Sequence, residues 1–302
     1  MTTAKTTILL VGATGHLGGL IARALLAKPD VHLRCLVRPG GSARAEALAA
    51  AGASIVEADL DDPEALDRAC AGAFAVVSAL QGGPPVIVDG QLRLLAAARR
   101  AGVRRFLPSD YSFDFFGIPE GDNINSDWRR RFAALAEEAR GEVEVVHVLN
   151  GCFLDRGVLF GFLGAFDLEA GEAYLWGEGD APMDFTTYAD TARYVAEAAT
   201  MRDTPPSRFC VAGDTLDFHG LVRAYEAATG RALTVVRRGS LADLDAEIAR
   251  RRAEQPTNLG AWLPMMYWRG MLNGTGALGE RVQGRFPAIQ PTTVEAYVRA
   301  TG

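Results

Sequence analysis

The stretch Gly12-Ala13-Thr14-Gly15-His16-Leu17-Gly18 decides the fold of this chain. It follows the apolar run Thr7 to Val11, which is typical of a buried strand, and it opens a segment from His16 to Ala27 whose apolar residues recur with helical spacing. Glycines in the pattern G-x-x-G-x-x-G between a strand and a helix are typical of a dinucleotide-binding turn. The context of the motif, rather than the glycines alone, makes this a strong prediction.

Each glycine has a separate task in such a turn. Gly12 permits the tight turn, Gly15 lets the backbone approach a pyrophosphate, and Gly18 lets the helix pack closely on the strand. The phosphates then lie at a helix N-terminus, where free N–H groups and the helix dipole favour anions. We therefore predict that the cofactor is bound by Gly12, Thr14, Gly15, His16, Leu17 and Gly18.

Short apolar runs alternate with helical stretches through the first half of the chain. This alternation predicts an α/β fold, a Rossmann-type doubly wound parallel sheet covered by helices on both faces. The predicted strands are Thr7–Val11, Leu33–Val37, Ser54–Glu57, Phe74–Ala79, Arg104–Leu107 and Val143–Leu149. The predicted helices are 16–27, 43–51, 63–71, 86–101 and 125–140. We assign residues 1–151 to this dinucleotide-binding domain.

The pattern loosens after Gly151, so we expect residues 152–302 to form a smaller, irregular α/β substrate lobe. Strands are predicted at Ala173–Trp176 and Arg208–Val211, and helices at 190–200, 218–229 and 241–254. Parts of this half, for example 173–211, are expected to return to the Rossmann sheet.

The end of the second strand discriminates between the two nicotinamide dinucleotides. An acidic residue there would bind the ribose hydroxyls and repel a 2′-phosphate. This chain instead has Arg38, then Pro39-Gly40-Gly41-Ser42 and Arg44, with no acidic residue before Glu46. A guanidinium binds phosphate bidentately. The sequence therefore predicts NADP(H) in preference to NAD(H), although a plain surface role also fits Arg38.

Three further residues are predicted to contact the nucleotide. Asp59, after the third strand, fits a position beside the adenine amino group, and it equally fits a cap on the helix that follows. Ser78 and Ala79, which end the fourth strand, are expected to contact the ribose.

The bulk composition argues against several classes of protein. The chain has 302 residues, a formal net charge of −6 and 23% charged residues. A nucleic-acid-binding surface is not expected at that charge. No apolar run reaches the roughly 20 residues of a membrane helix, and no signal segment is recognised at the start, so we predict a cytoplasmic protein. The basic pairs Arg99-Arg100 and Arg104-Arg105 are interpreted as solvated helix faces.

Cysteine and histidine usage indicates no metal centre. The four cysteines are far apart and lie mostly in apolar runs, which indicates buried free thiols. The four histidines lack metal-ligand spacing and are interpreted as ordinary hydrogen-bonded side chains. These residues are Cys35, Cys70, Cys152, Cys210, His16, His32, His147 and His219.

Taken together, several motifs resemble the atypical short-chain dehydrogenases of the NmrA-like and isoflavone-reductase-like group. They are Gly12 to Gly18, Leu36-Val37-Arg38-Pro39, Ala101 to Asp110, Asn150-Gly151-Cys152-Phe153, Trp176-Gly177-Glu178-Gly179 and Phe286 to Thr293. The resemblance covers nearly the whole chain. It implies a Rossmann domain with a substrate cleft against a small lobe. The group contains both NADPH-dependent reductases of aromatic compounds and catalytically silent redox sensors.

The chain departs from this group at the catalytic lysine. The resemblance implies a lysine on the helix after the loop Pro108-Ser109-Asp110, and alignment on Trp128 puts Arg131 there, or Arg130 after a one-residue shift. No lysine exists beyond Lys28. Arginine stays protonated near pH 7, so it can hold a hydroxyl or stabilise an alkoxide but cannot exchange a proton.

Another group must then donate the proton in a reductase. Tyr111 is our first candidate, because a phenol beside a guanidinium has a lowered pKa. Asp110 is the second, and Ser109 is expected to bond a substrate carbonyl. The plainer alternatives are an apolar wall for Tyr111 and a turn or cap for Asp110. The predicted catalytic set is therefore Tyr111, Arg131, Ser109 and Asp110.

Large apolar residues of the second half suggest a pocket for a bulky apolar substrate. The predicted lining is Phe113, Phe153, Trp176, Met183 and Phe185, with polar contacts from Asp184, Thr186 and Tyr188. A second cluster, Trp262, Met265, Met266, Tyr267, Trp268 and Met271, fits the core of the small lobe at least as well.

We therefore expect an NADPH-dependent reductase of a small, aromatic or conjugated carbonyl compound. The alternative is a non-catalytic NADP(H)-binding redox sensor of NmrA type that acts through a protein partner, which the missing lysine favours. An isomerase with tightly held cofactor is a third reading. A homodimer is compatible with the sequence.

Overall fold

The computed structural model describes residues 5–301 and divides the chain into two compact units that interleave along the sequence. Unit 1 comprises the chain through Tyr111, Trp128–Val148 and Thr191–Phe209. Unit 2 comprises Ser112–Asp127, Leu149–Asp190 and the chain from Cys210 onward. The predicted single boundary at residue 151 is thus replaced by several crossings. Residues 173–211 were expected to return to the Rossmann sheet, and of these only Thr191–Phe209 belongs to unit 1.

Unit 1 is built on a six-stranded sheet with the order β3-β2-β1-β4-β5-β6. All five neighbouring pairs are parallel. The strands are β1 (Thr6–Val11), β2 (Val31–Val37), β3 (Ser54–Glu57), β4 (Ala75–Ser78), β5 (Arg105–Leu107) and β6 (Glu144–Val145). This strand order is that of a Rossmann-type doubly wound sheet, so the predicted fold class is confirmed.

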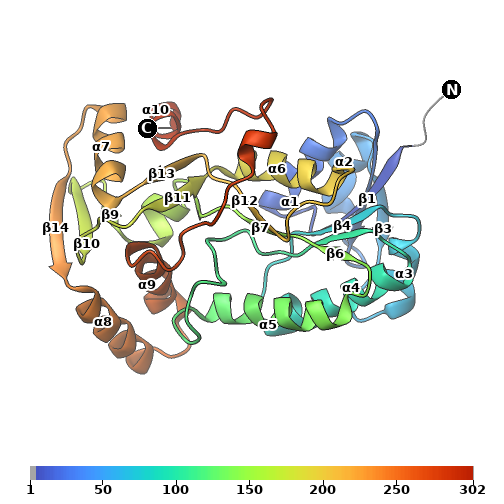
Figure 1. Ribbon diagram of the computed structural model, residues 1–302, viewed down its shortest axis with the longest axis horizontal. Helices are drawn as coiled ribbons and strands as arrows, with labels where there is room; N and C mark the ends of the chain where they lie inside the picture. Colours follow the sequence, from blue (N-terminus) through green and yellow to red (C-terminus); the bar gives the residue numbers. More distant parts are fainter. Residues whose placement is uncertain (1–4, 302) are drawn as a thin grey trace. The chain divides into compact units, whose positions relative to one another are not determined.

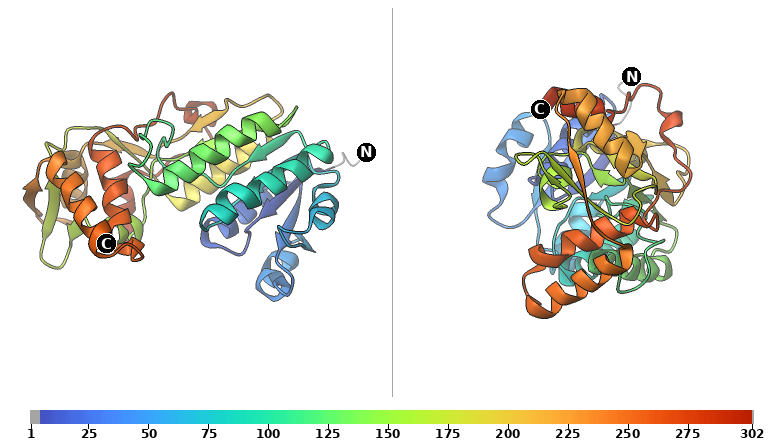
Figure 2. Two further views of the ribbon diagram at one scale, coloured as in Figure 1. Left: turned by 90° about the horizontal axis from the view of Figure 1, so that it is seen from below. Right: turned by 90° about the vertical axis from the view of Figure 1, so that its left-hand side faces the viewer.

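Helices cover both faces of this sheet (Figure 1). Helices α1 (His16–Leu26) and α6 (Tyr188–Thr200) lie on one face, and α3 (Pro63–Cys70), α4 (Gln91–Arg100) and α5 (Ile124–Ala139) lie on the other. Figure 2 shows α4 and α5 running side by side. Their apolar faces share a core with β4 and β5, in which the Phe106 and Phe132 ring centroids are 6.2 Å apart.

Two predicted elements of unit 1 are interrupted in the structure. The helix expected over 86–101 begins as a π-helical turn, η2 (Pro85–Gly90), before α4. The helix expected over 43–51 is a 3-10 turn, η1 (Ser42–Ala45), followed by α2 (Glu46–Ala50). The strand expected over 143–149 breaks at Val146, because Val146 N–H still bonds Phe106 whereas His147 N–H bonds Ser207. The chain thereby leaves β6 and continues as β7 (His147–Leu149).

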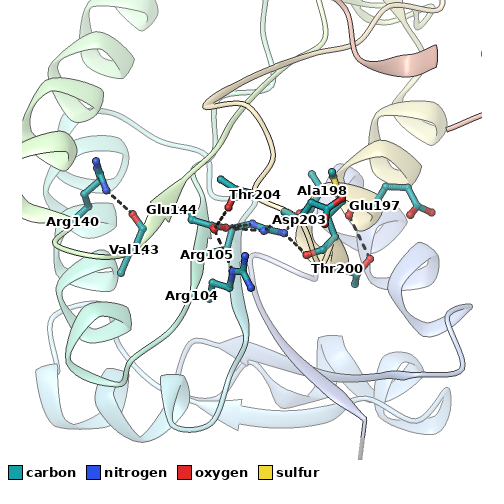
Figure 3. Close-up of polar contacts among 11 residues, drawn as sticks. Arg104, Arg105, Arg140, Val143, Glu144, Glu197, Ala198, Thr200, Asp203 and Thr204 are labelled. Carbon is teal, nitrogen blue, oxygen red and sulfur yellow. Dashed lines mark hydrogen bonds and ion pairs between the residues drawn. The ribbon is translucent and has the colours of Figure 1, made fainter. Parts of the chain in front are cut away.

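Arg105 corrects one prediction about surface charge. It begins β5 and is fully buried, rather than lying on a solvated helix face with Arg104. Its guanidinium donates to Glu144 at 2.7 and 2.9 Å and to the carbonyl oxygens of Ala198, Met201 and Asp203 at 2.7–3.0 Å (Figure 3). Burial is tolerated because the charge is paired and its donors are satisfied.

Unit 2 contains short strands in two three-stranded sheets. One has the order β14-β10-β9 and the other β13-β11-β8, while β12 pairs with β7. The strands of these two sheets are β8 (Cys152–Phe153), β9 (Phe166–Asp167), β10 (Glu172–Trp176), β11 (Met183–Thr186), β13 (Asp214–Leu216) and β14 (Thr234–Gly239). The first two residues of β12 (Arg208–Cys210) belong to unit 1 and its last to unit 2. The turns η3 (Val158–Phe162) and η4 (Gln283–Arg285) complete the irregular part.

Four helices supply most of the core of unit 2. They are α7 (Phe218–Thr229), α8 (Leu241–Glu254), α9 (Leu259–Leu272) and α10 (Val294–Thr301). The right-hand view of Figure 2 shows α8 and α9 packed together. The sequence marks the start of α7 and of α8, because Asp217 and Ser240 accept capping bonds from backbone N–H groups. The predicted bounds 218–229 and 241–254 are confirmed.

The four cysteines are buried free thiols, as predicted. Burial raises the pKa of Cys35, Cys70 and Cys152 to about 12, which leaves these thiols unreactive near neutral pH. Within residues 5–301, no helix combines the length and apolar character required to cross a membrane.

Candidate functional site

The glycine loop between β1 and α1 has the close backbone approaches that the motif requires. Gly12 has φ +89°, and a Cβ placed there would lie 2.5 Å from the Ala79 carbonyl oxygen. A Cβ on Gly18 would lie 2.1 Å from the Gly12 carbonyl oxygen. No side chain fits at either position, so the predicted roles of Gly12 in the turn and Gly18 in packing are confirmed.

The loop ends in a helix N-terminus prepared for an anion. Gly15 is the N-cap of α1, no side chain accepts a hydrogen bond at this cap, and the first turn carries no acidic residue. Thr14, Gly15 and His16 are exposed, whereas Leu17 is half-buried. Exposed N–H groups at a helix start favour phosphate, so this geometry supports the predicted contacts of these residues.

The loop after β2 holds a second set of donors. A turn closed by the Gly41 N–H on the Arg38 carbonyl at 2.8 Å brings Gly40, with φ +74°, to the surface. The Arg38 and Arg44 side chains are exposed. Among residues 5–301, neither guanidinium has a hydrogen-bonding or ionic partner. Unpaired guanidinium groups beside a turn are suited to bind a phosphate, as predicted for Arg38.

Sequence reasoning missed an acidic group in this loop. Glu57, the last residue of β3, accepts hydrogen bonds from the Ser42 hydroxyl and, at 3.3 Å, from the Gly40 N–H. The Ser42 hydroxyl, followed by the Gly40 N–H, holds the pKa of this carboxyl below its usual value. The usable signal was the sheet itself. Neighbouring parallel strands end at one edge, and Glu57 pairs in register with Val37.

Asp59 does not cap the next helix. The cap of α3 is Asp62, whose Oδ1 accepts from the Ala65 N–H at 2.9 Å. Asp59 is exposed, and its Oδ1 accepts from the Asp61 N–H at 3.0 Å. The capping alternative is therefore wrong, and the contact with adenine stays a prediction.

The ends of β4 and β5 bring together four predicted residues. The Tyr111 hydroxyl donates to the Ser78 carbonyl at 2.9 Å, and Ser78 Oγ is buried with no hydrogen-bond partner. The Ser109 hydroxyl donates to the Leu80 carbonyl at 2.6 Å, and its contact with a substrate carbonyl stays a prediction. Asp110 is fully buried.

Tyr111 is not the activated phenol that the sequence predicted. Burial, followed by the charge of Asp110, raises its pKa rather than lowering it, because both disfavour the phenolate. Its backbone φ is +30°, and within residues 5–301 no other non-glycine residue has a positive φ. A bulky residue in this conformation stores strain, and such strain concentrates at ligand sites.

Arg129, rather than Arg131, reaches the loop at the end of β5. Arg129 Nε donates to the Asp110 carbonyl at 2.9 Å, whereas Arg131 is exposed. The helix period explains the difference. Phe132 is buried in the core, and Arg129, three residues earlier, shares its side of α5. The contact with this loop is therefore made by Arg129, and a catalytic role for Arg131 stays a prediction.

Asp110 also has a partner that the sequence did not reveal. Its Oδ2 lies 2.7 Å from His147 Nδ1, and both side chains are at least nine-tenths buried. Its Oδ1 is buried with no hydrogen-bond partner among the described residues. The predicted reading of His147 as a hydrogen-bonded histidine is confirmed. The cap alternative for Asp110 finds no support in these contacts.

The predicted pocket residues of unit 2 are mostly core. Phe113, Met183 and Phe185 are buried in its hydrophobic cluster. The Phe153 ring stacks on Tyr188 at 3.9 Å. Trp176 alone among the five predicted lining residues borders a cavity of about 500 Å³ within unit 2, whose other lining residues include Phe162, Tyr174, Arg238, Met265 and Trp268.

The predicted polar contacts and the C-terminal apolar cluster of unit 2 also have mainly structural roles. Asp184 is committed to Arg281, to the Thr215 hydroxyl at 2.7 Å and to the Leu278 N–H at 2.9 Å, so it is not a free polar contact. The Thr186 hydroxyl donates to the Asn150 carbonyl at 2.7 Å. Of the C-terminal cluster, Trp262, Met266, Trp268 and Met271 are buried, and Met265 and Tyr267 pack against them, which confirms the packing interpretation.

Comparison with known proteins agrees with this geometry. The model of the NmrA-like family matches residues 4–115. The isoflavone reductase homolog IRL of Zea mays is 30% identical to this chain, over 99% of each. The chain belongs to the NmrA-like, isoflavone-reductase-like family. Pinoresinol reductase 1 of Arabidopsis thaliana is a further relative, 26% identical over 98% of this chain and 97% of its own.

Solved structures show the same fold. A structure of AtPrR2 with NADP+ and (+)-pinoresinol superposes with a TM-score of 0.83 at 21% identity, over 99% of this chain and all of the other. A crystal structure of isoflavone reductase gives a TM-score of 0.83 at 18% identity, again over 99% of this chain and all of the other. In the present chain, Arg129 of α5 contacts the Pro108-Ser109-Asp110 loop through the Asp110 carbonyl.

Proposed function

We propose that the protein is an NADPH-dependent reductase of a small aromatic or conjugated carbonyl compound. The observation that carries the proposal is the pair of anion sites at one edge of the unit 1 sheet. The glycine loop offers an uncapped helix N-terminus, and the β2 loop offers the unpaired guanidinium groups of Arg38 and Arg44. Two separate phosphate sites are what a 2′-phosphorylated dinucleotide requires.

Reductase names among the relatives support the aromatic substrate class. Relatives are named as an isoflavone reductase homolog, pinoresinol reductases and phenylcoumaran benzylic ether reductases. In unit 2, the cavity bordered by Trp176, Phe162 and Tyr174 has aromatic walls that suit an aromatic ligand.

For the chemical step, we assign to Arg129 the role first given to Arg131. Bound NADPH supplies a hydride. Arg129 stays protonated, so its contribution is to stabilise negative charge that develops on the substrate oxygen, while the proton comes from water. Tyr111 becomes a positioning residue, since its hydroxyl joins the end of β5 to Ser78 and its raised pKa makes it a weak acid near neutral pH.

Turnover tests this proposal directly. Purified protein should oxidise NADPH in the presence of at least one member of a panel of aromatic aldehydes, ketones, quinones and enones. Absence of turnover with every compound, in a preparation that binds NADPH, would contradict the reductase.

One observation favours a second candidate, a redox sensor acting through a protein partner: no lysine exists beyond Lys28. A ligand shifts a partner-binding equilibrium only through differential affinity. A sensor must therefore bind NADP+ and NADPH with different dissociation constants. Equal values would remove this alternative.

A further inference from the structure

The β2 loop already holds an anion, and that anion is a side chain of the protein. The two carboxylate oxygens of Glu57 take separate donors, Oε1 the Ser42 hydroxyl and Oε2 the Gly40 N–H. Backbone N–H groups and side-chain hydroxyls are also donors that bind phosphate oxygens in proteins. Glu57 thus occupies donors that a phosphate would use.

The cations beside this loop are not used by Glu57. Within the described chain, the Arg38 and Arg44 guanidinium groups form no ion pair, with Glu57 or with any other carboxylate. The loop therefore presents positive charge that remains uncompensated while its neutral donors are satisfied. The two guanidinium groups are therefore available to attract an anionic ligand, while the Glu57 carboxylate repels the same ligand.

We propose that Glu57 is a specificity-determining residue that occupies the 2′-phosphate site, so that NADP(H) must displace its carboxylate while NAD(H) need not. This inference rests on the proposed function, because it takes the dinucleotide and its 2′-phosphate at the β2 loop as given. It adds the residue that opposes the phosphate.

The exposure of Glu57 makes the displacement practicable. The side chain is at the surface, so its carboxylate can turn into water without losing solvation. Its lowered pKa means that it remains charged at neutral pH, so the ligand meets a full negative charge. Like charges in one site repel, and the repulsion applies to the 2′-phosphate far more than to a ribose hydroxyl.

The experiment measures dissociation constants of NADP+ and NAD+ by isothermal titration calorimetry for the unaltered protein and two variants, Glu57→Gln and Glu57→Ala. The first removes the charge and keeps the shape, and the second also frees both donors. We expect Glu57→Gln to bind NADP+ about five- to tenfold more tightly, and Glu57→Ala at least as tightly, corresponding to about 1–1.4 kcal/mol. NAD+ binding should change less than about twofold.

Glu46→Gln is the matched control. Glu46 begins the neighbouring helix α2, is exposed, and loses the same charge without touching Gly40 or Ser42. It should leave both dissociation constants unchanged. An equal gain in this control would reduce the effect of Glu57 to net charge and overturn the inference.

The outcomes separate this inference from the proposed function. If the unaltered protein binds NADP+ but both Glu57 variants bind it equally well or more weakly, the inference fails and the proposed function stands. If the unaltered protein binds neither dinucleotide, the proposed function fails. Thermal unfolding of each variant verifies that it is folded before titration.

Discussion

Arg105 and Arg38 are the same residue type at opposite edges of one parallel sheet, Arg105 at the amino end of β5 and Arg38 just beyond the carboxyl end of β2. Arg105 begins β5, is fully buried, and gives its donors to Glu144 and three carbonyl groups. Arg38 follows β2, is exposed, and its guanidinium has no partner among residues 5–301. A satisfied cation is part of the structure, whereas an unsatisfied one beside a glycine turn is available to a ligand. Carboxyl ends of parallel strands are where ligands bind.

The largest expected effect tests the structural role of Arg105. Arg105→Met removes a buried charge together with the hydrogen bonds that Arg105 donates to Glu144 and to three carbonyl groups. We expect the free energy of unfolding to fall by about 3–5 kcal/mol, measured by urea denaturation. The neighbouring exposed Arg104→Met should change it by less than about 1 kcal/mol. Similar losses for the two variants would contradict the assigned structural role of Arg105.

The next largest effect tests the role of the glycine loop in dinucleotide binding. Gly18→Ala places a methyl group 2.1 Å from the Gly12 carbonyl oxygen, whereas Gly19→Ala places one at an ordinary 3.5 Å from the Ala13 carbonyl. The first should weaken dinucleotide binding about a hundredfold or more, about 2.7 kcal/mol, because the loop must open. The second should bind nearly as the unaltered protein does. Fluorescence titration with NADPH measures both, and equal binding by both variants would refute the role of the loop.

A third prediction distinguishes the two arginines of α5. Arg129→Ala should lower turnover about ten- to a hundredfold with a smaller effect on NADPH affinity, because charge stabilisation acts mainly on the transition state. Arg131→Ala, at an exposed site, serves as the control and should be nearly unchanged. Steady-state kinetics with an accepted substrate gives the answer, and the reverse ranking would restore the original alignment.

The smallest effect is a pH dependence. Burial alone would raise the pKa of Glu144, but hydrogen bonds from Thr204 and Arg105 outweigh it and leave the pKa below its usual value. A carboxyl with a lowered folded-state pKa stabilises the fold above its unfolded pKa of about 4.3 and loses that contribution as pH falls through the folded value. The unaltered protein should therefore lose more stability than Glu144→Gln between pH 6 and pH 3. Parallel losses in urea denaturation would show that Glu144 does not contribute.

Much of unit 1 was predictable because its signals are local. The strand Ser54–Glu57 was predicted with its exact bounds, and the tasks of Gly12 and Gly18 follow from their spacing. The wrong predictions concern tertiary contacts of side chains with residues distant in the sequence. Burial of Arg105 depends on carbonyl groups more than 90 positions away, at Ala198 and beyond.

The errors at the site have the same origin. Glu57 reaches the β2 loop from an adjacent strand, so inspection of the residues directly after Arg38 did not reveal it. The pKa of Tyr111 was predicted in the wrong direction, because burial and the charge of Asp110 act on it in the folded protein. The pair of Asp110 and His147 joins residues 37 positions apart. Helix phase, in contrast, was readable, and it would have selected Arg129 over Arg131.

The central claim is that the β2 loop accepts a phosphate. Its most direct test is titration of the unaltered protein and Arg38→Ala with NADPH and NADH, with the exposed Arg23→Ala of α1 as control. A hydrogen bond to a charged group contributes about 1.5–3 kcal/mol, so Arg38→Ala should weaken NADPH binding about 10- to 100-fold and leave NADH nearly unchanged. Equal losses for the two dinucleotides, or no loss for either, would contradict the account.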